Sequence, residues 1–330
     1  MKEICIIKLG ADGDVLRTLP LAKAIRNKNK DSRITWITKG DIKSLIDNLD
    51  YIDYVENIPY STKKVFDELY NFDIEPAALD LAVLINADKK YGFYSEGEYP
   101  SAFNPGAEYY LNTMFDDELK KKNKKTYQEM MFMAAELPYK DEGYEIILGV
   151  KEREKADKFI QENNLERKKI VGIHMGAGSR WPSKAWHKER LIEFIEILKN
   201  KGYDIILFGG PNEKEKHEEI SYELNRMGIE ICRNKPDNSK REFASLVSIC
   251  DWIVCSDSFS LHVSLGLRKK TVALFFVTSP AEVEGYGTLT KISSPMLKDF
   301  FPEKSDEYNE ELVKSISASE VASVLLGHKT

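Results

Sequence analysis

Residues 3–16 read Glu-Ile-Cys-Ile-Ile-Lys-Leu-Gly-Ala-Asp-Gly-Asp-Val-Leu. The apolar run at 4–7 predicts a buried strand, and the two glycines that follow it predict a turn. The residues after the turn predict an amphipathic helix near 14–28. A strand that passes through a short turn into a helix is the building unit of α/β proteins with parallel sheets.

The same alternation continues along the whole chain. In the first half, strands are expected near 3–8, 33–38, 52–56 and 79–85, and helices near 14–28, 41–48, 62–70, 106–119 and 126–136. In the second half, helices are expected near 151–163, 187–200, 212–227, 239–249, 261–266 and 317–326, and strands near 169–174, 203–208, 229–232, 252–255 and 271–276. The pattern predicts an α/β protein of two facing Rossmann-like domains, residues 1–148 and 149–330, with a cleft between them. We expect the last helix, 317–326, to pack back on the first domain.

The composition fits two folded domains and excludes a general nucleic-acid partner. The chain has 330 residues, of which 42% are hydrophobic, and its formal net charge is −6. At about 150 residues per domain, this length predicts two hydrophobic cores. A mildly acidic chain has no overall positive field for nucleic acid, so an anionic ligand must be held by a local site.

Metal sites, disulfides and membrane spans are not expected. The four cysteines and five histidines show no spacing typical of a disulfide framework or a zinc site, so we predict no metal and no cofactor. The N-terminus has no signal-peptide core, and the longest apolar stretch, 272–277, is far too short to span a bilayer. These features predict a cytoplasmic protein without a transmembrane segment.

Asp14, in the first turn, has two interpretations. It can cap a helix that begins at Val15, or it can act as a general base at the carboxyl end of the strand. The spacing alone favours the cap. The glycines Gly10 and Gly13 match neither the dinucleotide-binding Gly-x-Gly-x-x-Gly fingerprint nor a phosphate-binding loop that ends in Gly-Lys-Ser/Thr.

Two turns in the second half carry residues suited to phosphate or ribose. The turn after 169–174 offers Arg180 and Lys184, which can hold a phosphate; alternatively, it is a surface loop anchored by Trp186. The next turn carries Glu213, which can accept hydrogen bonds from ribose hydroxyls or simply complement a helix dipole.

A third turn follows the strand near 252–255. Asp257 and Ser258 precede a helix whose first amides can hold an anion, although Ser258 can also serve only as an N-cap. His262, one turn into that helix, is better explained as a buried, hydrogen-bonded histidine than as a ligand.

Taken in chain order, four segments resemble those of the ADP-heptose–lipopolysaccharide heptosyltransferases, glycosyltransferase family nine. They are Lys8 to Leu16 with Thr18-Leu19-Pro20, Trp181 to Trp186, Phe208 to Pro211, and Ser256-Asp257-Ser258 with His262. The resemblance implies a GT-B fold, with the acceptor on the first domain and the nucleotide-sugar donor on the second. It also implies inverting transfer of a heptose or related sugar from an ADP-sugar to a lipid-linked saccharide, the inner core of lipopolysaccharide. Such a reaction is expected at the inner face of the inner membrane of a Gram-negative bacterium.

The resemblance also implies roles for single residues. Asp14 looks like the catalytic base, and Lys184 looks like the lysine that meets the donor diphosphate and assists catalysis. Residues assigned to the donor are Ser179, Arg180, Lys184, Gly209, Gly210, Glu213, Asn238, Asp257, Ser258, Phe259, Ser260 and His262. Phe259 stands where the family usually has glycine, and a side chain there narrows the pocket or changes which sugar fits.

The implied acceptor is anionic, so basic residues are expected to meet it despite the net charge of −6. Residues assigned to the acceptor are Gly13, Arg17, Lys63 and Lys64. Lys39 and the lysine run 120–125 are further candidates, although a solvated loop is the favoured interpretation of the run.

Two other functions fit the same motifs. A nucleotide-sugar epimerase or isomerase of the GT-B fold would consume its donor without an acceptor. A non-catalytic nucleotide-binding protein would keep the fold, but folding alone does not require Asp14, Lys184 and Asp257 together.

Overall fold

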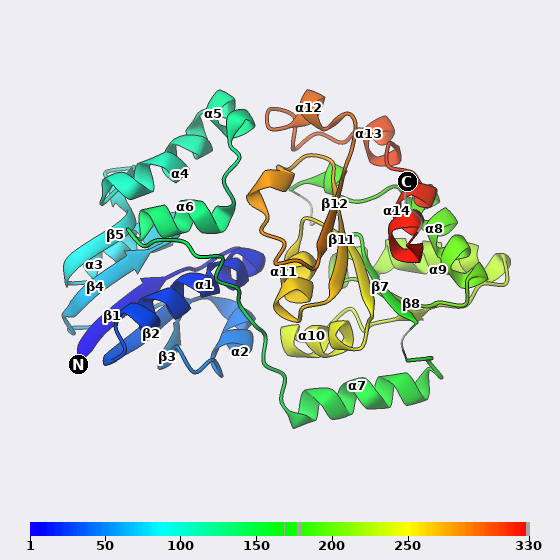
Figure 1. The fold of residues 1–330 in the computed structure, drawn as a ribbon, viewed down its shortest axis with the longest axis horizontal. Helices are drawn as coiled ribbons and strands as arrows, with labels where there is room; N and C mark the ends of the chain where they lie inside the picture. Colours follow the sequence, from blue (N-terminus) through cyan, green and yellow to red (C-terminus); the bar gives the residue numbers. More distant parts are fainter. Residues whose placement is uncertain (168, 177–179, 328–330) are drawn as a thin grey trace. The chain divides into compact units, whose positions relative to one another are not determined.

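The computed structural model describes residues 1–167, 169–176 and 180–327. Its contacts divide the chain into two compact units (Figure 1): residues 1–147 with 281–284, and residues 148–280 with those from 285 onward. Each unit contains one six-stranded sheet.

The sheet of the first unit has the strand order β3-β2-β1-β4-β5-β6. Its strands are β1 (Lys2–Ile7), β2 (Ser32–Thr38), β3 (Tyr54–Asn57), β4 (Phe66–Asn71), β5 (Ala87–Glu96) and β6 (Tyr99–Ala102). Neighbouring strands are parallel except β5 with β6. Its helices are α1 (Asp12–Lys28), α2 (Lys43–Ile46), α3 (Pro76–Leu84), α4 (Pro105–Phe115), α5 (Asp117–Lys122) and α6 (Tyr127–Ala134). β1 lies inside the sheet, and its apolar run is fully buried, as a strand between two others requires.

The sheet of the second unit is parallel throughout and has the order β12-β11-β10-β7-β8-β9. Its strands are β7 (Ile170–His174), β8 (Asp204–Phe208), β9 (Cys232–Arg233), β10 (Trp252–Ser256), β11 (Lys270–Phe275) and β12 (Leu289–Ser293). Its helices are α7 (Val150–Glu162), α8 (Lys188–Asn200), α9 (Lys214–Arg226), α10 (Lys240–Ser248), α11 (Phe259–Gly266), α12 (Leu297–Phe300), α13 (Glu310–Lys314) and α14 (Ala318–Leu326).

Both sheets change their direction of winding at the first strand. β1 lies between β2 and β4, and β7 lies between β8 and β10. In Rossmann-like domains, ligands bind at the carboxyl ends of the strands where this change occurs. The prediction of two Rossmann-like α/β units with parallel sheets is confirmed, and the turns after these strands are the place for a functional site.

The predicted helix at 62–70 is wrong, because residues 66–71 form strand β4 beside β1. The acidic residue Glu68 is tolerated in this buried strand because it accepts hydrogen bonds from Tyr70 Oη at 2.8 Å and from Lys2 Nζ at 3.1 Å. These partners could not be foreseen, since Lys2 comes from the neighbouring strand.

The predicted strand at 79–85 is also wrong, because residues 76–84 form helix α3. Pro76 stands at the start of the helix, where its missing N–H has no helical partner to lose. Ala78 and Ala82 share one buried face at a spacing of four residues, which is a helical period. Strands β5 and β6 follow in a stretch for which the sequence predicts no strand.

The last helix belongs to the core of the second unit, which corrects the prediction that it packs on the first. α14 lies against α8, and its apolar residues Ala318, Val321, Ala322 and Leu325 are buried in that core. The apolar spacing of the helix is therefore satisfied within its own unit.

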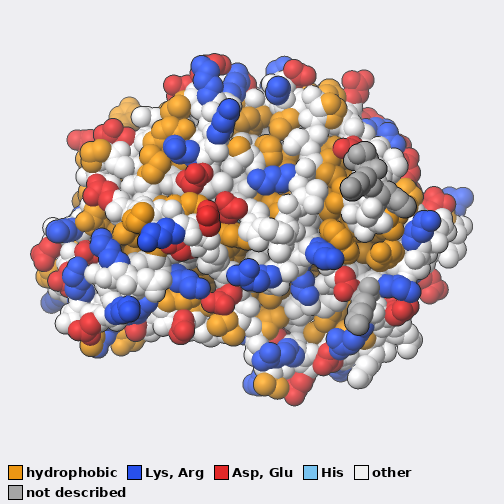
Figure 2. Space-filling view, in the orientation of Figure 1, with side chains coloured by type: hydrophobic (Ala, Val, Ile, Leu, Met, Phe, Trp, Pro, Cys, Tyr) orange, Lys and Arg blue, Asp and Glu red, His pale blue; other side chains and the backbone are white. Residues whose placement is uncertain are grey.

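Charges on the surface are mixed on the face that Figure 2 presents. Acidic and basic side chains lie among one another over most of that face, in keeping with a net charge of −6. Lys and Arg side chains gather over α5, and hydrophobic side chains lie over the neighbouring α4.

Candidate functional site

Asp14 is the third residue of α1, which begins two residues before it. Asp14 Oδ1 lies 2.8 Å from Arg17 Nη2, and the Ala11 N–H donates to Asp14 Oδ2 at 3.3 Å. The Asp14 side chain is 32% exposed. Asp14 is therefore not the N-cap residue, which is Ala11, but its carboxylate does cap the helix start by accepting from the Ala11 N–H, so the capping interpretation is wrong in position and right in kind. A partly exposed carboxylate in an ion pair stands at the carboxyl edge of the first sheet.

A buried ion pair that the sequence analysis missed lies at the same edge. Lys8 Nζ is 3.4 Å from Asp73 Oδ2, and both side chains are almost fully buried. The same Asp73 oxygen accepts hydrogen bonds from the N–H groups of Leu9 and Gly10, at 2.9 and 3.0 Å. Burial by itself lowers the pKa of Lys8, but Tyr127 and Asp73 outweigh burial and hold that pKa above its ordinary value. A charged lysine therefore ties the turn after β1 to the turn after β4.

Of the two residues of this ion pair, Lys8 could be recognised from the sequence. A lysine that directly follows a buried strand, as Lys8 does, needs a carboxylate partner. Asp73 follows a strand that the sequence assigns to a helix, so its place at the same edge could not be foreseen.

Lys63 and Lys64, assigned to the acceptor from the sequence, do not lie with Asp14. Both lysines precede β4, and Lys64 pairs with Glu3 near the start of β1. They occupy the amino edge of the sheet, one strand length of roughly 20 Å from the carboxyl edge. They therefore do not share an edge with Asp14, and charge alone does not reveal the edge at which a residue lies.

Other basic residues do lie at the carboxyl edge of the first sheet. Gly13 and Arg17 are on α1 with Asp14. Lys39 directly follows β2, and its Nζ lies 2.8 Å from Glu75 Oε1, after β4. Arg17 and Lys39 are therefore the candidates that the fold brings to this edge.

In the second unit, Lys184 links the turns after β7 and β10. Lys184 Nζ donates to the backbone oxygen of Asp257 at 3.0 Å and lies 3.5 Å from Asp257 Oδ2. The two side chains are 14% and 17% exposed, so the ammonium remains within reach of solvent. The arrangement parallels the Lys8–Asp73 pair: in each unit, a lysine after the first strand meets an aspartate after the fourth.

Glu213 lies against glycines at the carboxyl edge of the second sheet. The Gly210 N–H donates to Glu213 Oε2 at 2.8 Å. A Cβ on Gly176 would lie 2.6 Å from Glu213 Oε1, and a Cβ on Gly209 would lie 2.2 Å from His217 Cε1. A side chain at Gly209 would meet the His217 ring, and one at Gly176 would displace the end of the Glu213 side chain. Glu213 therefore stands between the turns after β7 and β8.

Asn234 fixes the Gly209 turn, and the sequence analysis missed it. The Gly209 N–H donates to Asn234 Oδ1 at 2.9 Å, and Asn234 Nδ2 donates to Gly209 O at 3.0 Å. Asn234 Nδ2 also donates to Asn238 Oδ1 at 3.2 Å. Asn238 is therefore linked through Asn234 to the turn at Gly209, which follows β8. No motif marks Asn234, because its role depends on the pairing of β8 with β9.

Helix α11 begins after β10, with Ser258 as its N-cap residue. The Ser258 hydroxyl donates to Ser256 O at 3.2 Å and lies 2.9 Å from Ser260 Oγ; it makes no capping hydrogen bond within the described part of the chain. His262, one turn later, is buried. This burial agrees with a histidine held in the core.

Phe259 packs into an aromatic cluster. Its ring lies 5.6 Å from that of Phe243 on α10. Phe243 in turn lies 5.3 Å from Phe208 and 6.0 Å from His174, at the ends of β8 and β7. A substitution at Phe259 would therefore alter this cluster as well as the start of α11.

Two histidines near this edge are neutral at pH 7. Burial lowers the pKa of His174 and of His217 to about 4. His174 and His217 therefore supply no positive charge for an anionic ligand at neutral pH.

Ser179 and Arg180 are the two residues that the sequence assigns to the phosphates beside Lys184. Ser179 lies outside the described residues. Arg180 is exposed, and its Cζ lies 5.0 Å from the centroid of the Trp181 ring, which is also 5.7 Å from Lys184 Nζ. The two cations assigned to the diphosphate therefore share one aromatic neighbour.

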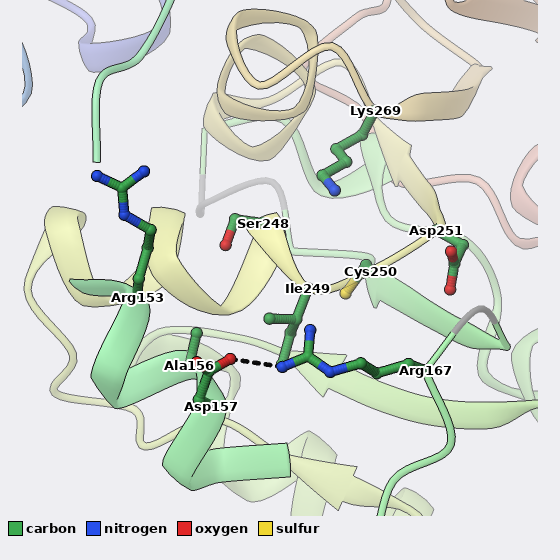
Figure 3. Close-up of a pocket in the computed structure, with 9 residues that line it drawn as sticks. All are labelled: Arg153, Ala156, Asp157, Arg167, Ser248, Ile249, Cys250, Asp251 and Lys269. Atoms are coloured by element: carbon green, nitrogen blue, oxygen red, sulfur yellow. Dashed lines mark hydrogen bonds and ion pairs between the residues drawn. The ribbon is translucent and has the colours of Figure 1, made fainter. Parts of the chain in front are cut away.

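A pocket of about 440 Å³ lies at the opposite, amino edge of the second sheet (Figure 3). Figure 3 shows Arg167 turned toward Asp157 of α7, with which it forms an ion pair of 2.5 Å. Ser248, which ends α10, and Lys269, which follows the end of α11, also line it. None of the residues that line this pocket is among those assigned to the donor.

The architecture of two Rossmann-like units, with candidate base and donor residues on different units, is that of the GT-B class of glycosyltransferases. The family described as "Glycosyltransferase family 9 (heptosyltransferase)" matches residues 78–310, which is more than half of the chain. The chain belongs to this family. The resemblance to this family is thereby confirmed. Three of the four sequence segments lie within the matched residues, and the segment from Lys8 to Pro20, which contains Asp14, precedes them.

Individual relatives agree with this assignment. Over 112 residues the chain is 34% identical to lipopolysaccharide heptosyltransferase 2 of Salmonella typhimurium; the match covers 34% of this chain and 32% of that protein. The chain thus spans about a third of the length of this curated relative. A glycosyl transferase family 9 structure from Veillonella parvula has a TM-score of 0.76 at 18% identity, covering 99% of this chain and 97% of that chain. The structure of ADP-heptose lps heptosyltransferase II of E. coli has a TM-score of 0.72 at 17% identity, covering 99% and 98%.

Proposed function

We propose that the protein is an inverting glycosyltransferase that moves heptose, or a related sugar, from an ADP-sugar to the inner core of a lipopolysaccharide acceptor. Family membership and the names of its relatives support this proposal. The observation that carries it is that the candidate base and the candidate donor-binding side chains lie on different units. One unit bears the partly exposed carboxylate of Asp14, and the other bears Lys184 and Glu213, each group at the carboxyl edge of a parallel sheet.

The residues of the second unit suit a nucleoside diphosphate. Lys184 offers an ammonium that the diphosphate can share with Asp257. A charge-assisted hydrogen bond strengthens as negative charge develops on the leaving group, so Lys184 would stabilise departing ADP. Glu213 would accept hydrogen bonds from the ribose hydroxyls. Transfer in this form needs no metal ion bound by the protein, because Lys184 supplies the positive charge.

The residues of the first unit suit proton abstraction. Arg17 engages Asp14 Oδ1, and Asp14 Oδ2 would take the proton of the acceptor hydroxyl as that oxygen attacks the anomeric carbon. The bond from the anomeric carbon to the diphosphate breaks on the opposite face, and its electron pair leaves with ADP. One displacement of this kind inverts the configuration at the anomeric carbon.

ADP should stabilise the protein more than UDP, GDP or NAD does. A ligand that binds only the folded state adds RT ln(1 + [L]/Kd), about 2.7 kcal/mol at a hundredfold excess over Kd. For a unit of this size, that corresponds to a rise in Tm of roughly 5–10 °C. Glu213→Ala should reduce the shift with ADP, and the control Lys63→Ala, at the amino edge of the other unit, should not. A larger shift with UDP would contradict the ADP-sugar donor and leave the fold untouched.

We further propose that the protein works at a membrane surface, where a lipid-linked acceptor lies. In the described part of the chain, no helix is long and apolar enough to cross a bilayer. Phe115, at the end of α4, is 70% exposed, and the run 120–125 that follows carries five lysines. Figure 2 shows Lys and Arg side chains over α5 and hydrophobic side chains over the neighbouring α4. An exposed aromatic ring and nearby lysines suit the interface of an anionic membrane. The loop interpretation of the run is wrong for its first three lysines, because they end helix α5, where Lys121 and Lys122 lie 3.2 and 3.7 Å from Glu118.

Vesicles of phosphatidylcholine with about one third phosphatidylglycerol should bind the protein, and pure phosphatidylcholine vesicles should bind it much less. Each lysine near the surface contributes about 1 kcal/mol, so changing Lys120, Lys121 and Lys122 to Gln should lower the partition coefficient roughly a hundredfold. Phe115→Ser should lower it as well. Leu84→Ser on α3 is the matched control, because Leu84 is 76% exposed and stands apart from the lysine run in sequence. Equal losses for Phe115→Ser and Leu84→Ser in co-sedimentation would contradict a specific membrane surface.

A further inference from the structure

Tyr127, the first residue of α6, is buried against α1 although it comes 109 positions after Thr18. Its side chain contacts Arg17 and Thr18 of α1, and each of these two residues contacts Asp14. The candidate base is therefore supported by a second helix from the far end of its unit's sequence.

The ring of Tyr127 supports the ion-pair partner of Asp14. The guanidinium carbon of Arg17 lies 3.8 Å from the ring centroid, and Arg17 Nη2 lies 2.8 Å from Asp14 Oδ1. Only 15% of the Arg17 side chain is exposed. A guanidinium stacked in this way loses rotamer freedom, so the ring fixes the direction from which Arg17 meets the carboxylate.

The hydroxyl of Tyr127 supports the backbone of Asp14. Thr18 Oγ1 donates to the Asp14 carbonyl oxygen at 2.6 Å and lies 2.9 Å from Tyr127 Oη. A threonine hydroxyl has one proton, and that proton is used in the bond to the carbonyl. Tyr127 Oη must therefore donate to Thr18 Oγ1. The ring contact and the hydroxyl contact thus reach the carboxylate and the carbonyl of the same residue.

We propose that Tyr127 is a positioning residue for the catalytic base: its ring and its hydroxyl together hold Asp14 in the orientation that receives the acceptor's proton. The inference rests on the proposed function only in taking Asp14 as the base. Misplacing a catalytic group by about 1 Å can cost a hundredfold in rate, so support from a buried side chain has kinetic consequences.

Several charged or titratable groups face this part of α1. They are Lys8 in the turn after β1, Asp12 and Arg17 on α1, Asp73 after β4, Tyr110 on α4 and Tyr127 on α6. Burial raises the pKa of Tyr110 and of Tyr127, so both hydroxyls stay protonated at neutral pH. Lys8 and Arg17 are the cations of this set, and both favour an ionised carboxylate at Asp14.

Three variants separate the two contacts. Tyr127→Leu removes both contacts and should lower kcat about tenfold or more, with the KM for the ADP-sugar unchanged. The acid limb of kcat/KM against pH should move to higher pH, because a loosened Arg17 stabilises the ionised carboxylate less. Tyr127→Phe loses the hydroxyl contact alone and should lower kcat only about two- to threefold. Thr18→Val also loses the hydrogen bond to the Asp14 carbonyl oxygen and removes the acceptor of the Tyr127 hydroxyl, so it should lower kcat at least as much as Tyr127→Phe.

Tyr110→Leu is the matched control, because Tyr110 packs edge-on against Tyr127 with centroids 5.9 Å apart. It removes a neighbouring ring and leaves the Tyr127 contacts with Arg17 and Thr18 in place. The Tm and the ADP-induced shift are measured for every variant. If Tyr127→Leu does not fold, Tyr127→Met replaces it, since the flexible methionine side chain fills much of the same space without the ring or the hydroxyl and should show the same kinetic loss.

A second measurement does not depend on transfer. The carboxyl carbon of Asp14, assigned with Asp14→Asn, is titrated by ¹³C NMR in the wild type, Tyr127→Leu and Tyr110→Leu. Its midpoint should rise in Tyr127→Leu and stay at the wild-type value in Tyr110→Leu. A wild-type protein that transfers no sugar would refute the proposed function, and the titration would still decide whether Tyr127 holds Asp14. Equal kcat values and equal midpoints in the two leucine variants would overturn the inference.

Discussion

Asp14→Asn is expected to lower kcat by roughly 10²–10⁴-fold and to leave donor binding almost unchanged. Asparagine keeps the size of the side chain and an oxygen for Arg17, whose Nη2 lies 2.8 Å from Asp14 Oδ1 in the native protein. It cannot take the proton of the acceptor hydroxyl. The loss should appear in kcat rather than in KM, because the bond to that proton forms only in the transition state.

Asp12→Asn is the matched control for this experiment. Asp12 lies in the first turn of α1 together with Asp14, so each replacement removes one negative charge from the same helix end. Rates of sugar transfer, donor Kd and Tm are measured for both variants. Near-native transfer by Asp14→Asn, at an unchanged Tm, would mean that another group is the base.

Lys184→Met should weaken ADP-sugar binding by about 10–100-fold and lower kcat as well. A hydrogen bond to a charged group contributes about 1.5–3 kcal/mol, and the bond from Lys184 strengthens as ADP leaves. Methionine keeps the length of the side chain, so the loss reports the ammonium. The effect on kcat separates Lys184 from Glu213, because Glu213→Ala should weaken donor binding more than it slows the chemical step.

Lys188→Met controls for the loss of a nearby lysine. Lys188 begins α8 and pairs with Glu219 and Glu223 of α9, at 2.6 and 2.7 Å, so it lies in a structural ion pair. Donor Kd is measured by calorimetry and kcat by single-turnover transfer. Unchanged donor Kd and kcat in Lys184→Met would mean that Lys184 only joins the turns after β7 and β10 and does not bind the donor.

Buried parallel strands leave a strong pattern in the sequence, which is why much of the fold could be predicted. β1, β7 and β10 fall within a residue or two of the predicted ranges, because each is an apolar run that ends in a turn. β4 could not be predicted, because the acid in it is satisfied by a lysine from another strand. α3 did leave signals in the sequence, namely Pro76 at its start and the helical spacing of Ala78 and Ala82, and the prediction of a strand overlooked them.

The predictable part of the site consists of residues that follow strands in recognisable turns. Asp14, Lys184, Glu213 and Asp257 belong to this group, because turns after parallel strands meet at one edge of a sheet. Asp73, Asn234 and Tyr127 could not be found in this way. Each of them acts on a residue that is distant in sequence, and only the folded structure brings the two together.

Acceptor dependence is the most direct test of inverting sugar transfer. ADP-heptose is incubated with the protein in the presence and in the absence of a lipopolysaccharide inner-core acceptor, and NMR follows the release of ADP and the anomeric configuration of the product. We expect ADP only when the acceptor is present, and a product whose anomeric configuration is inverted relative to the donor. Consumption of ADP-heptose without the acceptor, as by an epimerase or isomerase, or a product with retained configuration, would contradict the proposed function.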